Sequence, residues 1–127
     1  MRLLHVRTAT RRHAGDGPPG SDLSTWSRST GSRTTVRVAG EVDLVTAPML
    51  KEALESAYLS VRTSRAHPEL LVDLRGVSFL SAAGLSVLAV LHVRCVVDGL
   101  SIRIVGDQRA VRRPMELTGL DQLLAKQ

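Results

Sequence analysis

Residues 70–85 read LLVDLRGVSFLSAAGL, and this stretch decides the fold. Leu70–Leu74 is a short, compact apolar run, which favours a strand near the centre of a sheet. Ala82–Val97 carries apolar residues around much of its circumference, which indicates a largely buried helix. Gly99 follows at the position of a left-handed C-terminal cap. A buried strand that leads directly into a buried helix is typical of an α/β domain.

The flanking sequence continues this alternation of strands and helices. Gly40 is expected to end the second strand, and Pro48 suits the first turn of a helix, where its missing N–H does no harm. The remaining predicted elements are, in chain order, strands at 23–28 and 34–39 that pair as a hairpin, a helix from Pro48 to Val61, a strand at 101–105, and short helices at 108–118 and 120–126. We therefore predict a single α/β domain with a mixed sheet of four to five strands and helices mainly on one face.

The N-terminal residues 1–21 are predicted to form a basic, flexible leader ahead of a domain at residues 22–127. Residues 9–21 are rich in Gly, Pro and charge, as linkers are, and residues 1–8 are either a short strand or untethered. The leader holds four arginines and one acid, whereas residues 22–127 hold thirteen bases and eleven acids. The net charge of +5 is therefore concentrated in the leader. A nearly neutral domain argues against direct binding of nucleic acid.

Composition excludes several further classes of protein. Aromatic residues make up only 2% of the chain, too few for a surface that stacks bases. One cysteine excludes an internal disulfide, and Cys95 is most simply a small core residue. The four histidines and this cysteine show no metal-ligand spacing, so we expect no metal and no cofactor. The longest apolar stretch is too short to cross a membrane and no secretory signal is present, so we expect a cytoplasmic protein.

No arrangement of residues indicates catalysis. Asp43, Ser81 and Ser86 suggest a hydrolase at first sight, but a serine nucleophile needs a base that a third group holds in place. His92 is the one histidine near these residues in the sequence, two helical turns beyond Ser86 on a mostly apolar helix. We therefore expect a binding protein rather than an enzyme.

Three segments, in the right order and spacing over residues 22–127, resemble the STAS-domain family of anti-sigma factor antagonists. VAGEVD at 38–43, followed by Thr46 and Ala47, resembles the entry into the first helix of that family. VDLRGVSFLSAAGL at 72–85 resembles its central strand, switch loop and second helix. VRRPMELTGL at 111–120 resembles its last helix. Each motif alone is weak, whereas the three together are specific.

The resemblance implies a protein that binds an anti-sigma factor, usually a kinase of the histidine-kinase-like ATPase fold, and so frees a sigma factor. In the family, the kinase phosphorylates a serine in an Asp-Ser-Ser-Gly-Leu loop at the start of the second helix, and the phosphate abolishes binding. A helix N-terminus tolerates that charge through its free N–H groups. The expected partner-binding switch loop here is Asp43, Ser81, Ala82, Gly84, Leu85 and Ser86, with Ala83 at the phosphoacceptor position.

The chain departs from the family at four positions: Ser81, Ala82, Ala83 and Pro114. Ser81 stands in place of the acid, and we expect its hydroxyl to cap the helix. Ala83 has no hydroxyl, so the family's switch cannot operate there, although Ser81 and Ser86 flank the site. Asp43 is expected to add to the negative field, Gly84 to allow close approach of a partner, and Leu85 to anchor the helix. Pro114 implies that the last helix starts near Arg112 or Arg113, or is kinked.

Two functions therefore fit the sequence. The first is an anti-sigma factor antagonist without the usual serine switch, controlled by expression, by another protein or by redox chemistry at Cys95. The second is a cytoplasmic accessory subunit of a membrane transporter for lipids or anions, since STAS domains also serve there and need no phosphoacceptor. The sequence leaves the oligomeric state open.

Overall fold

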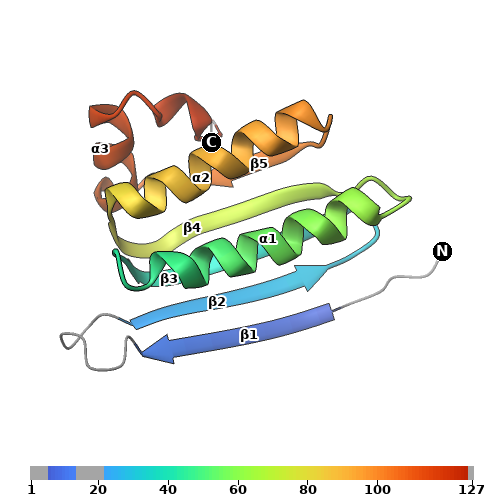
Figure 1. The fold of residues 1–127 in the computed structure, drawn as a ribbon, viewed down its shortest axis with the longest axis horizontal. Coiled ribbons are helices and arrows are strands. Elements are labelled where there is room, and N and C mark those ends of the chain that lie inside the picture. The colour runs from blue at the N-terminus through green and yellow to red at the C-terminus, as the bar shows by residue number, and fades with distance from the viewer. Residues whose placement is uncertain (1–5, 14–21, 126–127) are drawn as a thin grey trace.

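A computed structural model describes residues 6–13 and 22–125 of the 127-residue chain (Figure 1). The described elements follow in the order β1 (Val6–His13), β2 (Asp22–Ser29), β3 (Arg33–Val42), α1 (Ala47–Thr63), β4 (Glu69–Leu80), α2 (Ala82–Val97), β5 (Ile102–Val105), α3 (Arg109–Leu117) and a short 3₁₀ turn, η1 (Asp121–Leu123). Strands and helices thus alternate from β3 onward, as the sequence predicts.

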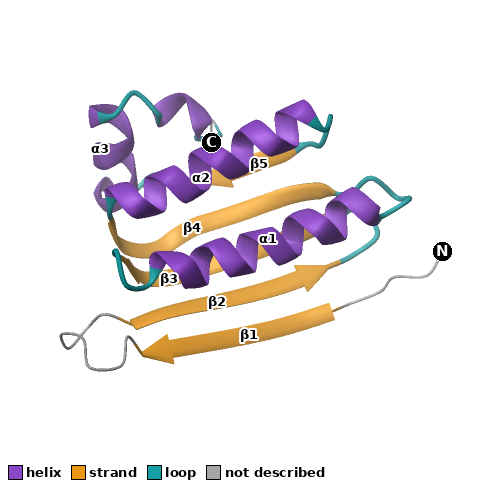
Figure 2. Ribbon diagram, viewed as in Figure 1, coloured by secondary structure: helices purple, strands orange, loops and turns teal. Residues whose placement is uncertain are grey.

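The strands form one mixed sheet in the order β1-β2-β3-β4-β5. The pairs β1–β2 and β2–β3 are antiparallel, whereas the pairs β3–β4 and β4–β5 are parallel. Helices α1 and α2 make the two crossovers and lie against the same face of the sheet (Figure 2). The predicted α/β domain with a mixed sheet and helices mainly on one face is therefore confirmed.

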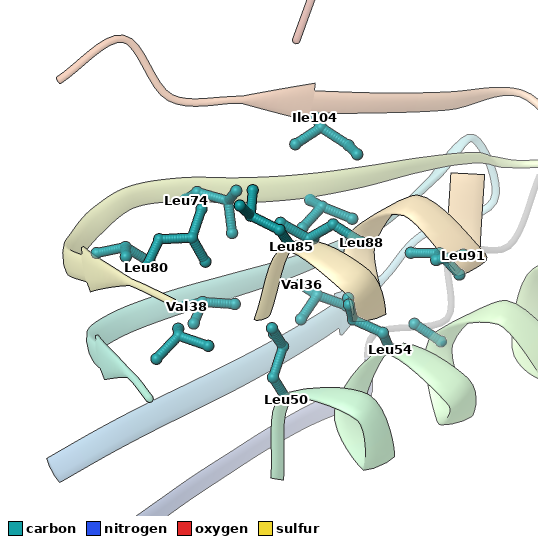
Figure 3. Close-up of a cluster of buried hydrophobic side chains, with 14 of the residues drawn as sticks. Val36, Val38, Leu50, Leu54, Leu74, Leu80, Leu85, Leu88, Leu91 and Ile104 are labelled. Carbon is teal, nitrogen blue, oxygen red and sulfur yellow. The ribbon is translucent and has the colours of Figure 1, made fainter. Parts of the chain in front are cut away.

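Alternating side chains of the central strands form the core on the face that α1 and α2 cover. Val36, Val72 and Ile104 lie side by side in register across β3, β4 and β5, and all three are fully buried. Leu54 of α1 and Leu88 of α2 belong to the same buried cluster and pack on the helix-covered face of the sheet (Figure 3). Both helices therefore owe their positions to apolar burial on one sheet face.

Strand β1 lies within the predicted leader, and this corrects the expectation of a flexible segment over residues 6–13. All eight of its residues pair with β2, from Val6 opposite Ser29 to His13 opposite Asp22. The sequence VRTATRRH alternates β-branched with other residues, and β2 would otherwise present an unpaired edge of N–H and C=O groups. The expectations for residues 1–5 and 14–21 lie outside the described residues.

Strands β3 and β4 both extend further than predicted. Gly40 does not end β3; it adopts a φ of 109° at a register shift, and the strand continues to Val42. A Cβ at Gly40 would lie 2.2 Å from the carbonyl oxygen of Asp22, so the bulge needs glycine. Strand β4 runs on from Leu74 to Leu80 beside β3, and Gln108 Nε2 donates to the carbonyl of Leu74 at 2.6 Å.

Helix α3 begins at Arg109 and contains Pro114, so the expected late start near Arg112 or Arg113 is wrong. A proline at this point removes the hydrogen bond to the carbonyl of Ala110 and crowds that carbonyl with its ring, at a cost of about 3 kcal/mol. Val111 and Met115 are fully buried on either side of it. The burial of these two side chains outweighs the cost of the proline.

The second face of the sheet, opposite α1 and α2, carries polar side chains. Asp73 is the buried acid of this face: Arg75 donates to its two oxygens at 3.0 and 2.9 Å, and Arg37 lies 3.6 Å away. The hydrogen bonds of the Arg75 side chain are the main reason that the pKa of Asp73 lies below its usual range. The carboxylate is thus ionised and shared by two guanidinium groups.

Replacing Asp73 with Asn tests this arrangement. The lowered pKa of Asp73 in the folded state means that its contribution to stability is present above the usual carboxyl pKa and is lost as the pH falls through the folded value. We expect the variant to unfold with a free energy about 1–2 kcal/mol lower at neutral pH. Urea denaturation over a pH series measures the gap, which should narrow below about pH 4. A gap that does not change with pH would contradict the assignment.

Candidate functional site

The ends of β3 and β4 and the starts of α1 and α2 meet at one edge of the sheet (Figure 1). Val42 and Leu80, the last residues of the two strands, pair directly, and Ser81 N–H donates to the carbonyl of Val42 at 2.8 Å. The predicted switch loop therefore comes together in space, with Asp43 on one side and residues 81–86 on the other. In α/β sheets, this carboxyl edge of parallel strands is where binding sites most often form.

Ser81 caps helix α2. Its side-chain oxygen accepts a hydrogen bond from Gly84 N–H at 3.4 Å, while its carbonyl accepts one from Leu85 N–H at 3.0 Å. An N-cap serine satisfies one of the free donors in the first turn of a helix. The hydroxyl of Ser81 thus has the structural role that the sequence predicts for it.

Ala83 is the second residue of α2, in the turn whose N–H groups give a helix its positive end. It is half-buried and packs against the hydrophobic core, whereas its neighbour Ala82 is exposed. The methyl group of Ala83 therefore lies at the margin between core and surface and offers no hydroxyl group.

Gly84 and Leu85 both face inward. Gly84 is buried, and a Cβ there would lie 2.5 Å from Val42 Cγ1 and 2.8 Å from Leu80 Cδ1. Its small size lets α2 approach the ends of β3 and β4, and so serves internal packing rather than the expected approach of a partner. Leu85 is buried in the core, where it anchors the helix as expected.

Asp43 organises the loop that leads into α1. Its Oδ1 accepts hydrogen bonds from the N–H groups of Val45 and Thr46 at 2.9 and 2.8 Å. The Thr46 hydroxyl oxygen in turn accepts from Asp43 N–H at 2.9 Å and donates to the carbonyl of Glu41 at 2.7 Å. The acid expected to contribute a negative field is thus also the residue that shapes the loop.

Large apolar side chains are exposed around this edge, and the sequence analysis did not single them out. Leu44 is 79% exposed, Val45 59% and Phe79 48%. We call these three residues, together with the exposed Ala82 and Ser86 at the start of α2, the docking patch. Two sequence features could have indicated that these side chains are exposed. Leu44 and Val45 lie in a turn, and Phe79 is adjacent in sequence to a buried residue of the strand. Exposed apolar groups at a strand–helix edge are typical of a protein-binding surface.

Ser86 also lies at the rim of an open groove of about 230 Å³ between α1 and α2. Lys51 and Glu55 line it from α1, and Val90 and Arg94 from α2. Arg94 Nη1 donates to Glu55 Oε2 at 2.6 Å, which ties the two helices together at one end of the groove. The groove therefore extends the docking patch along the helical layer.

The remaining candidate residues do not converge on a reactive site. Cys95 is fully buried, and burial raises the pKa of its thiol, so the protonated form prevails at neutral pH. Among residues 6–13 and 22–125, no three His, Cys, Asp or Glu side chains are grouped as metal ligands would be. None of the helices in this part of the chain is long and apolar enough to span a bilayer. The geometry thus favours a surface for binding another protein.

Comparisons with known proteins agree with this geometry. The family model described as "Mlab, STAS domain" matches residues 27–125. The Anti-sigma-F factor antagonist RsfB of Mycobacterium tuberculosis, in strains CDC 1551 / Oshkosh and H37Rv, is 33% identical over 85 residues. That match covers 67% of this chain and 65% of the relative, so the chain spans just under two thirds of the curated relatives' length.

Solved structures with the same fold include two antagonists. An anti-sigma factor antagonist from Mycobacterium paratuberculosis is 32% identical, with a TM-score of 0.68 over 84% of this chain and 86% of that one. The unphosphorylated form of the anti-sigma factor antagonist SpoIIAA superimposes with a TM-score of 0.59 over 76% of this chain and 80% of that one. Its identity is 13%, so this likeness concerns the fold alone.

Gly84→Ala tests whether the close contact with Val42 and Leu80 sets the position of α2. Helix propensity alone predicts that the alanine stabilises by up to about 1 kcal/mol. The close contact predicts the opposite: the free energy of unfolding should fall by about 1–2 kcal/mol, because buried side chains must shift to make room for the methyl group. Thermal and urea unfolding decide between the two signs. Ala82→Gly, at the exposed position two residues earlier, is the control and should cost no more than propensity predicts; stabilisation by Gly84→Ala would contradict the packing role.

Proposed function

Because this chain belongs to the STAS domain family, whose model covers residues 27–125, we propose that it is an anti-sigma factor antagonist: it binds an anti-sigma factor and so frees a sigma factor for transcription. Two relatives that share about a third of their residues with it, one curated and one solved, carry that description. Their role supports a regulatory binding protein rather than an enzyme, and a cytoplasmic location follows from a role in transcription.

The docking patch is the observation that carries this proposal. Leu44, Val45 and Phe79 expose apolar surface at the edge where the family's switch loop lies. Asp43 and Ser81 hold the two loops in place through hydrogen bonds to backbone N–H groups. A preformed loop with exposed apolar side chains loses little conformational entropy on binding, which favours tight association.

The antagonist is proposed to act without the serine switch of its family. Ala83 offers no hydroxyl, and the hydroxyl of Ser81 caps α2. Ser86 is exposed but lies in the second turn of the helix, beyond the free N–H groups that stabilise a phosphate. A phosphate would add about two negative charges to the patch, and this chain lacks the group that receives it. Binding is then governed by the amounts of the two proteins.

The proposed partner is an anti-sigma factor of the histidine-kinase-like ATPase type, and no direct contact with nucleic acid is required. The buried Cys95, with its raised pKa, gives redox control no accessible thiolate to act on. The alternative, an accessory subunit of a membrane lipid or anion transporter, uses the same fold. The antagonist relatives at 32% and 33% identity favour the first function.

Charge insertion in the docking patch tests the partner surface. Phe79→Glu and Leu44→Glu should each weaken binding to the anti-sigma factor at least about tenfold, because a carboxylate must be desolvated in an apolar interface. Isothermal titration against the histidine-kinase-like anti-sigma factors of the same genome measures this. The matched control is Leu117→Glu on α3, an equally non-conservative change at a residue that is 73% exposed. Equal losses in all three variants would contradict the assignment, and binding only to a transporter subunit would favour the alternative.

Introducing a hydroxyl tests the missing switch. With the partner kinase and labelled ATP, the wild-type chain should take up no phosphate, and Ala83→Ser should be labelled at position 83. The control, Ala82→Ser, places a hydroxyl one residue earlier and should stay unlabelled. Peptide mass spectrometry locates the label. Stoichiometric phosphate on Ser81 or Ser86 of the wild-type chain would contradict the proposal.

A further inference from the structure

The second face of the sheet, which α1 and α2 leave uncovered, carries a cluster of arginines that the proposed function does not use. Five arginines and two carboxylates lie there on strands β2 to β5, together with a tryptophan. We call this cluster the basic sheet patch: Trp26, Arg28, Arg33, Arg37, Glu69, Asp73, Arg75 and Arg103.

One carboxylate of the patch holds two guanidinium groups. Asp73 is almost fully buried, with 5% of its side chain exposed, while the side chains of Arg37 and Arg75 that contact it are 57% and 65% exposed. Arg75 donates from Nε and one Nη in a fork to the carboxylate, at 3.0 and 2.9 Å. Arg37 also stacks over the ring of Trp26, with 4.8 Å from Cζ to the ring centre. These contacts hold the charged ends of both arginines in place at the surface.

The second carboxylate, Glu69 at the start of the same strand, also lies between two guanidinium groups, but it forms ion pairs with them rather than forked hydrogen bonds. Glu69 Oε1 lies 3.2 Å from Arg33 Nη2 and 3.9 Å from Arg103 Nη1. The register of the sheet sets this spacing, because Arg33 pairs with Glu69, just as Arg37 pairs with Asp73. Two arginine–acid–arginine triads therefore lie on the same face of the sheet, one on β3 and β4 and the other across β3, β4 and β5.

The patch carries more positive charge than its own acids neutralise. Each carboxylate serves two guanidinium groups, so four positive charges contact two negative ones. Asp22 and Glu41 lie at the opposite end of the same sheet face. Ordered guanidinium groups that share a carboxylate keep part of their positive charge and some of their N–H donors, and these suit an incoming anion.

We propose that the basic sheet patch binds an acidic segment of a protein partner, through guanidinium–carboxylate pairs of the kind that Asp73 and Glu69 already make. An open hollow beside the patch, of about 540 Å³, is lined by Arg28, Arg33, Glu69 and three hydroxyl side chains, Thr30, Ser32 and Thr35. Its two arginines outnumber its one carboxylate, and it gives a carboxylate of the partner room to enter. Nucleic acid is disfavoured, because the patch has a single aromatic ring and Arg37 already covers it. The basic sheet patch shares no residue with the docking patch, so the proposal does not depend on the proposed function.

Binding of a fluorescein-labelled oligoglutamate peptide to the full chain tests the proposal by fluorescence anisotropy at about 0.15 M salt. Arg37→Gln and Arg103→Gln should each weaken binding about five- to tenfold, because charged pairs to ordered arginines are lost. Arg37→Lys keeps the charge without the fork and should recover only part of the affinity. The matched control, Arg62→Gln at the exposed end of α1, removes the same charge and should leave affinity within about twofold.

Several results would overturn the proposal. The first is the absence of saturable peptide binding, and the second is an equal loss of affinity in Arg62→Gln. The third is tighter binding of single-stranded oligothymidylate than of the peptide. The fourth is co-sedimentation with phosphatidylglycerol vesicles that the Arg37 variant abolishes. Thermal unfolding of each variant establishes that the fold is intact, and Arg103→Gln disturbs it least because its contact with Glu69 is long. Phe79→Glu should bind the peptide like the wild-type chain, so a failure here is separable from a failure at the docking patch.

Discussion

The contact between the first turn of α2 and the ends of β3 and β4 sets the rest of the site. Gly84 lies so close to Val42 and Leu80 that a single methyl group would overlap both side chains. The hydrogen bond from Ser81 N–H to Val42 closes the same junction through the backbone. Because these contacts fix where α2 begins, they also fix Ala83 at its N-terminal turn and present Phe79 to solvent beside it. Core packing therefore sets the α2 side of the docking patch, while the hydrogen bonds of Asp43 and Thr46 shape the loop that carries Leu44 and Val45.

The elements nearest this junction could be predicted from the sequence, because their signals are local. The sequence predicts Ser81 as the N-cap of the helix, Gly99 as its left-handed C-terminal cap, and the apolar run before Ser81 as a strand. The structure has all three features. What the sequence did not reveal depends on pairing between distant segments. Strand β1 exists because β2 offers a free edge, and β3 continues through Gly40 because a bulge absorbs the glycine. Helix α3 tolerates Pro114 because the helix buries Val111 and Met115 in the core.

The same limit applies to the surfaces. The motif that resembles the family located Ala83, whereas the exposure of Leu44 and Phe79 depends on tertiary structure. The basic sheet patch is more hidden still, because Arg37 and Asp73 are far apart in the chain and become neighbours through strand register alone. In the sequence, the excess of arginine over acid is most concentrated in residues 1–21. The fold instead collects part of the basic character of the protein on one face of the sheet, opposite the helical layer.

The central claim is that this chain frees a sigma factor and cannot be switched off by phosphorylation. Run-off transcription from a promoter of that sigma factor, with RNA polymerase, the anti-sigma factor and ATP present throughout, measures both parts at once. The account predicts that an equimolar amount of the chain restores transcription and that the level holds during prolonged incubation with ATP. Transcription that never recovers would contradict the antagonist role, and transcription that recovers and then decays with ATP would contradict the missing switch.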